Sequence, residues 1–221
     1  MAATIKKETI QFLRDLTKNN NRDWFEKNKS KYLEANQNWI DFVGALIHGI
    51  SKFDKGVANK QPKECVFRIY RDVRFSKDKS PYKTNFAAKF MPHFKAAAAG
   101  YYIHIGPGEM LLAGGNHMLE PKELKAVREE ISENAKGFLK VISDKAFKST
   151  FRIEGEKLTN VPNGFDKEDP MAEYLKHKEL YIVHDIAEKD IYSDKFADEC
   201  VKVFKQMIPF NSFVNRPVLS V

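Results

Sequence analysis

The sequence predicts an α+β fold in which long N-terminal and C-terminal helices pack on a mostly antiparallel central sheet. Near both ends, apolar residues recur every three or four positions, as on one face of a helix, whereas in the middle they alternate, as in a strand. Short turns join the alternating segments, which favours antiparallel neighbours. Because there is no repeat and no linker rich in Gly, Ser or Pro, residues 1–221 are predicted to form a single globular domain.

Two helices are expected at the N-terminus. Thr4 can cap the first helix, which carries an apolar face and ends at the asparagines of positions 19–21. Those asparagines also supply the cap of a second, much longer helix, whose apolar stripe runs from Trp24 to Phe53. We expect this helix to end before Gly56.

Four strands are expected in the middle of the chain. The first covers residues 65–75, and its apolar face holds Phe67, Ile69, Val73 and Phe75. The second alternates at Phe86, Ala88, Phe90 and Phe94. The third and fourth cover residues 100–105 and 109–113, with a turn at residues 106–108 between them.

Helices and two further strands are expected in the C-terminal half. Pro121 opens a helix whose apolar face continues to Ile142. Strands are expected at residues 151–153 and 181–186, with a short helix after Asp169 between them. Ser193 is expected to cap a last helix, and Pro209 to stop it.

The net charge of +7 lies in one short segment. Residues 60–95 hold ten Lys or Arg and three acids, so the remaining 27 basic and 27 acidic residues cancel. A local excess of positive charge creates a local positive potential, and this potential favours an anionic partner.

Residues 68–83 of this segment hold most of the candidate ligand-binding site. The candidates are Arg68, Arg71, Arg74, Lys77, Lys79, Tyr82 and Lys83. On a strand, Arg71 would point into the apolar face, where its donors need a carboxylate, carbonyl groups or a bound anion. Arginine suits bidentate capture of carboxylate or phosphate, and the lysines add flexible point charges.

A structural interpretation of the same residues is also open. Arg71 and Asp72 could be internal ion-pair partners that fasten the strand to the long helix. Residues 77–83 could be a solvated hairpin tip that discourages edge pairing.

Tyr102 and His104 complete the candidate ligand-binding site. They share one face of a predicted strand, and a histidine near a cationic cluster could act as an acid or a base. The structural alternative is a hydrogen-bonded histidine on a half-buried sheet. The sequence contains no phosphate-binding glycine motif, nucleophile elbow or metal-ligand spacing. No metal or cofactor is therefore expected, and whether the chain is an enzyme stays open.

Membrane and secretory classes are not expected. No stretch approaches the roughly 20 apolar residues that cross a bilayer, and no signal-peptide pattern opens the chain. Cys65 and Cys200 lie in apolar patterns far apart in sequence, which favours two buried, unpaired thiols in a cytoplasmic protein.

Four stretches of the chain resemble the bacterial conserved hypothetical proteins of the family called domain of unknown function 2461. These stretches are NNRDWF at residues 20–25, residues 68–83 with RDVRFSKDKSPYK, AGYYIHIGPG at residues 99–108, and PNGF at residues 162–165. They span nearly the full length, and the second is quite specific. The resemblance implies a compact cytoplasmic single-domain protein of α+β type, and it brings no catalytic residue or cofactor with it.

The sequence thus supports three functional hypotheses. The first is binding or turnover of a small phosphate- or carboxylate-bearing ligand at the Arg- and Lys-rich motif. The second is a protein-interaction or structural domain with an acidic partner. The third is a nucleic-acid-binding module with Tyr70, Phe75 and Tyr82 as stacking partners, although no RNP1-like string or helix-turn-helix signature is visible.

Overall fold

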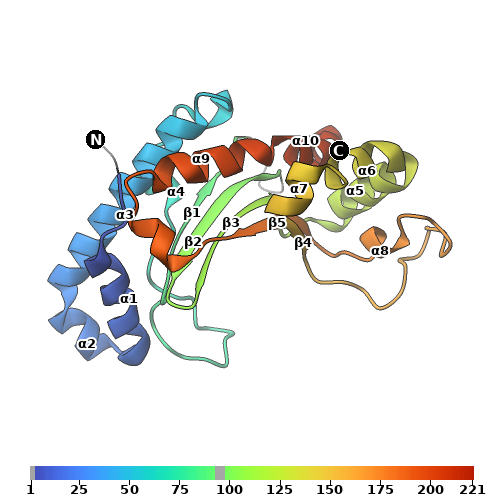
Figure 1. Cartoon of the computed structure of the whole chain (residues 1–221). Helices are drawn as coiled ribbons and strands as arrows, with labels where there is room; N and C mark the ends of the chain where they lie inside the picture. The colour runs from blue at the N-terminus through green and yellow to red at the C-terminus, as the bar shows by residue number, and fades with distance from the viewer. Residues whose placement is uncertain (1–2, 93–97) are drawn as a thin grey trace. The chain divides into compact units, whose positions relative to one another are not determined.

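The computed structural model describes residues 3–92 and 98–221, so Phe94 and Lys95 lie outside the described residues (Figure 1). Ten α-helices and a five-stranded antiparallel sheet in this part of the chain confirm the α+β class. The strand order is β1-β2-β3-β5-β4. The strands are β1 (Phe86–Phe90), β2 (Gly100–Gly106), β3 (Glu109–Asn116), β4 (Arg152–Glu154) and β5 (Leu180–Asp185).

The chain divides into two compact units. The first comprises residues 1–90, 102–112 and 185–202, and the second comprises residues 91–101, 113–184 and 203–221. The boundaries fall after β1, inside β2, β3 and β5, and inside a helix near the C-terminus, α9 (Phe196–Gln206). That residues 1–221 form a single domain stays a prediction.

Three helices begin the first unit. They are α1 (Lys7–Lys18), α2 (Arg22–Lys27) and α3 (Lys29–Ile50), with α1 and α2 beside α3 (Figure 1). Asn21 caps α2 by accepting the Trp24 N–H at 2.9 Å, as predicted for the asparagine run. The predicted long helix is interrupted at Asn28, which separates α2 from α3.

The expectation that Thr4 caps the first helix is wrong. Helix α1 begins at Lys7, and no side chain of its own segment caps it. Asn38 of α3 serves instead. Its Oδ1 accepts the Lys6 N–H at 3.0 Å, and its amide donates to the Thr4 carbonyl at 2.9 Å.

The predicted strand at residues 65–75 is wrong as well. Helix α4 (Pro62–Cys65) ends there, and an irregular hairpin follows, which we call the cationic hairpin (residues 66–85). An isolated bridge of Tyr70 with Tyr82 pairs its two arms, and a second bridge joins Val66 to Ala88 of β1. Figure 1 shows the hairpin as a loop without helix or strand. Pro81 lacks an N–H for a regular ladder, and nearby Asp side chains bond the local backbone instead.

The central strands agree with their prediction. The alternation at Phe86, Ala88 and Phe90 produces β1, and all three side chains are buried. Strands β2 and β3 form a hairpin whose turn contains Gly108 with φ of 90°, a conformation that glycine adopts without steric cost.

The second unit is largely helical. Helices α5 (Pro121–Glu133) and α6 (Ala135–Ile142) replace the single predicted helix, because Asn134 ends one and caps the next. Two short helices follow, α7 (Lys145–Thr150) and α8 (Ala172–Leu175). Helix α10 (Ile208–Ser220) packs against α5 and α6 (Figure 1).

The expected stop at Pro209 is wrong. Helix α9 (Phe196–Gln206) does end just before it, but Pro209 lies in the first turn of α10. A proline is tolerated there because its missing N–H would have no partner within the helix.

Two buried asparagines of α10 bond to the backbone at the start of β2. The Asn215 amide accepts the Ala99 N–H at 2.5 Å and donates to the Ala99 carbonyl at 3.1 Å. Asn211 donates to the Gly100 carbonyl at 3.0 Å. These bonds satisfy buried backbone groups at the start of the strand.

Candidate functional site

The tip of the cationic hairpin (residues 72–80) supplies the bonding partners of the Arg71 side chain. The Arg71 guanidinium pairs with Asp78 and lies 3.3 Å from the Ser76 hydroxyl and 3.4 Å from the Ser80 carbonyl. Only 25% of its side chain is exposed. Hydrogen bonds from Ser80, and then from Arg71, lower the pKa of Asp78 to about 2. The donors of Arg71 are therefore largely occupied.

Two other cations of the tip are also internally bonded. Arg74 donates from Nε and Nη2 to the two carboxylate oxygens of Asp72 at 3.0 and 2.7 Å. This side-chain contact lowers the pKa of Asp72. The Lys79 ammonium donates to the Val73 carbonyl at 2.9 Å. Ion pairs and hydrogen bonds within the hairpin thus stabilise its tip. The partner of Arg71 is Asp78, not Asp72 as the structural interpretation of the sequence suggested.

Arg68 and Lys83 lie at the base of the hairpin and have a different environment. Lys83 is half-buried, with its Nζ 5.1 Å from the centre of the Phe67 ring. Burial, and then the nearby charge of Arg68, lower the pKa of Lys83. Within residues 3–92 and 98–221, neither cation forms an ion pair with a carboxylate.

Tyr102 and His104 of β2 adjoin this pair through Phe67. The Phe67 and Tyr102 rings meet edge to face at 6.2 Å. The Tyr102 hydroxyl lies 3.4 Å from the His104 Nδ1. These contacts form a continuous row of Lys83, Phe67, Tyr102 and His104. We use the name base cluster for the polar residues here, which are Arg68, Lys83, Tyr102 and His104.

The surroundings of His104 favour its neutral form. Burial lowers the pKa of His104, while Glu109, whose carboxylate lies 3.6 Å from Nε2, opposes that shift. The Asn85 amide lies 3.4 Å from Nδ1. The sequence interpretation missed Asn85 and Glu109, and the Gly106–Gly108 turn that brings Glu109 back beside His104 was the available signal.

Tyr82 lies away from the base cluster, in an aromatic core. Its ring stacks on Phe25 at 3.9 Å and is 4% exposed. The Asn20 amide bonds both sides of its backbone, accepting the N–H at 3.1 Å and donating to the carbonyl at 2.9 Å. Tyr82 thus anchors the hairpin to the turn between α1 and α2.

The seven cationic and aromatic candidates of the hairpin therefore separate into four groups. Arg71, Arg74 and Lys79 are bonded within the tip, Lys77 is exposed, and Tyr82 is an anchor. Only Arg68 and Lys83 lie with Tyr102 and His104.

Three further properties bear on the chemistry of the chain. Across residues 3–92 and 98–221, no three His, Cys, Asp or Glu side chains are placed to hold a metal ion. The two cysteines are free and buried, and burial raises the pKa of Cys65 to about 11. No described helix combines the length and apolar character that crossing a membrane requires.

Comparison with known proteins places the chain in a family. No curated protein and no solved structure matches it. A family model described as "Conserved hypothetical protein (DUF2461)" matches residues 8–213. Because this match covers nearly the whole fold, the chain belongs to the DUF2461 family of conserved hypothetical proteins.

Proposed function

We propose that the base cluster binds a small anionic ligand that carries a phosphate or carboxylate group. The observation that supports this most is that the charge of Arg68 acts on half-buried Lys83, and neither cation forms an ion pair with a carboxylate among the described residues. The charge of Arg68 also acts on Asp72, which is itself bonded to Arg74. The two like charges repel, and burial weakens the hydration of Lys83, whereas Arg68 is exposed. A bound anion would relieve both costs.

The ligand would meet two kinds of donor. Arg68 can hold a carboxylate or phosphate by two parallel hydrogen bonds, and Lys83 adds a point charge. Each charge-assisted hydrogen bond of this kind contributes about 1.5–3 kcal/mol. Two such contacts are enough for a weak but specific site.

Tyr102 and His104 would orient the ligand from β2. The Tyr102 hydroxyl can donate to a ligand oxygen, and burial raises the pKa of Tyr102, which keeps this proton in place. His104 is neutral in these surroundings and can therefore accept a proton as a base. If the ligand is also turned over, His104 is the residue that would exchange a proton with it.

A ligand screen tests the proposal. The intact chain is heated with inorganic phosphate, nucleotides, sugar phosphates and dicarboxylates, and the midpoint of thermal unfolding is recorded. A ligand at 100 times its Kd stabilises the folded state by about 2.7 kcal/mol. We expect Arg68→Ala and Lys83→Ala to remove the upward shift of the midpoint.

Lys140→Ala is the matched control, because Lys140 is an exposed lysine of α6 in the other unit. It should leave the ligand-induced shift unchanged. If no anion raises the midpoint, or if the shift persists in both hairpin variants, the base cluster is not an anion site.

Single-stranded nucleic acid is a second candidate ligand, on a separate observation. Phe75 at the hairpin tip is 95% exposed, Tyr70 is 48% exposed, and Arg74 lies 5.9 Å from the Phe75 ring. Exposed aromatic rings among cations can stack on bases, at about 1–3 kcal/mol per base. Anisotropy of a labelled oligonucleotide should show binding that weakens in Phe75→Ala. Unchanged affinity in that variant would dismiss this candidate.

A further inference from the structure

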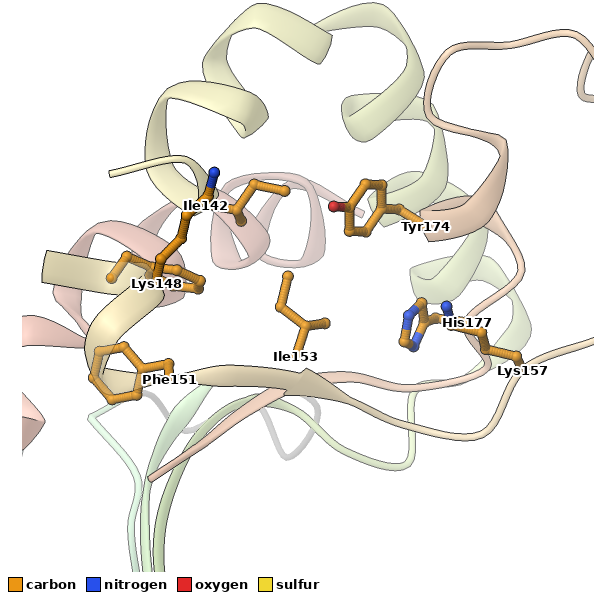
Figure 2. A pocket seen from close by; sticks show the side chains of 8 residues that line it. Ile142, Lys148, Phe151, Ile153, Lys157, Tyr174 and His177 are labelled. Atoms are coloured by element: carbon orange, nitrogen blue, oxygen red, sulfur yellow. The ribbon is translucent and has the colours of Figure 1, made fainter. Parts of the chain in front are cut away.

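A pocket of about 290 Å³ lies in the second unit, between α6, α7, β4 and α8 (Figure 2). Its wall is apolar on the side of Ile142, Phe147, Phe151 and Ile153. Ile153 points up into the pocket from β4, while Ile142 and Tyr174 face it from the helices above (Figure 2). This volume is at the lower end of the range for small-molecule sites, roughly 300–1,000 Å³.

The polar lining of the pocket is basic and contains no carboxylate. It consists of Lys148, Lys157, Tyr174 and His177. The Tyr174 hydroxyl points toward the interior, and the Lys157 ammonium lies beside the His177 ring (Figure 2). The carboxylate nearest to the Lys157 ammonium belongs to Glu173, at 3.9 Å. This carboxylate is paired more closely with Lys176.

His177 is buried at this end of the pocket. It is 4% exposed, and its backbone carbonyl accepts a hydrogen bond from Arg128 at 2.9 Å. The Glu179 carbonyl is near enough to raise the pKa of His177, but Nδ1 makes no hydrogen bond of regular geometry among the described residues. Burial, and then the charge of Lys157, lower the pKa of His177. A buried polar ring with incomplete bonding beside an ammonium group is a favourable place for an anionic oxygen.

We propose that this pocket binds a small amphipathic carboxylate, separately from the base cluster. The apolar body of the ligand, an aromatic ring or a short alkyl chain, packs on Ile153 and Phe147. The carboxylate lies between Lys157, His177 and the Tyr174 hydroxyl. The apolar wall supplies affinity through burial, and the basic end selects an acid over a neutral molecule.

A matched pair of ligands tests both halves of the proposal. 4-Phenylbutyrate and 4-phenylbutan-1-ol share the apolar body and differ in the charged group. Titration of the intact chain, followed by nuclear magnetic resonance, should shift the His177 ring and Ile153 methyl signals with the acid. The alcohol should bind at least tenfold more weakly. Equal affinity for the two, or no shift of these signals at millimolar acid, would overturn the proposal.

Two variants localise the site. Ile153→Phe fills the apolar part of the pocket and should abolish binding of the acid. Lys157→Met should weaken binding of the acid about tenfold, so that the affinities for acid and alcohol become more similar. Lys122→Met replaces an exposed lysine of α5 and should change neither. A separate measurement of the unfolding midpoint shows that each variant is folded. Retained affinity in a folded Ile153→Phe variant would place the ligand elsewhere and reject the pocket.

Discussion

Side-chain amides of asparagine bond backbone groups that lie far away in the sequence. Asn20 bonds both backbone groups of Tyr82, Asn215 does the same at Ala99, and Asn38 bonds the segment before α1. An amide offers one acceptor and two donors, so it can imitate the edge of a neighbouring strand. Each of these bonds joins residues that lie far apart in the sequence, so local sequence patterns do not predict them.

Asn215→Asp should destabilise the protein. The substituted carboxylate still accepts the Ala99 N–H, but it cannot donate, and it faces the Ala99 carbonyl in a buried place. Leaving a buried acceptor unsatisfied costs about 1–3 kcal/mol, and urea unfolding measures this loss. Asn21→Asp is the control, because Asn21 acts as a helix cap and Asp caps equally well. Equal stability of the two variants would contradict the role given to Asn215.

The pH dependence of anion binding should follow His104. Its pKa is below 6.5 in the folded protein, so its contribution to stability is complete above pH 6.5 and is lost as the pH falls toward the lowered pKa. An anion at the base cluster would raise this pKa. Sulfate keeps its charge from pH 8 to 6, and its affinity should therefore increase over that interval. A ring-proton titration of His104 with and without sulfate checks this, with exposed His48 as the reference. An unshifted His104 titration would separate this residue from the anion site.

Helix α3 contains two glycines in contrasting surroundings. A Cβ added at Gly49 would come within 3.0 Å of Val201 in the first part of α9, whereas at Gly44 the nearest atom is Pro62 Cγ at 3.5 Å. The α3 backbone thus approaches α9 closely at Gly49, and the rings of Phe42 and Phe196 also stack, at 5.3 Å.

Alanine substitutions at these glycines should therefore have opposite effects. Gly49→Ala overpacks the contact with α9 and should lower the free energy of unfolding by about 1–3 kcal/mol. Gly44→Ala fits the space and should raise it by about 0.5–1 kcal/mol, because alanine loses less entropy in a helix. Chemical unfolding of the two variants measures both values. A stabilised Gly49→Ala would show that Val201 moves aside.

The elements with a clear period were predictable, and the cationic hairpin was not. Strands β1 to β3 and the helical stripes follow from burial of one face, which the alternation of apolar residues records. Residues 65–75 alternate equally well, yet Phe75 is exposed, because Asp72 and Asp78 bond the adjacent backbone and replace a ladder. The predicted strand neighbours Tyr102 and His104 do lie side by side on β2, and their place in a ligand site stays a prediction. Only the fold separates Arg68 and Lys83 from the internally paired cations.

At the scale of the whole chain, the two compact units raise the question of cooperativity. The chain passes from one unit to the other inside β2 and β3, so neither unit is a continuous stretch of sequence. We expect one unfolding transition in differential scanning calorimetry, with equal calorimetric and van't Hoff enthalpies. Two resolved transitions would contradict the prediction that residues 1–221 form one domain.

The asparagine contacts also have a consequence for solvent exchange of the backbone. The amide protons of Tyr82 and Ala99 are bonded to Asn20 and Asn215, although neither residue lies within a named strand. Their deuterium uptake should be slow, and each should become fast when its own asparagine is replaced by alanine. Two single protons would then report when the hairpin detaches from the turn between α1 and α2, and when the start of β2 detaches from α10.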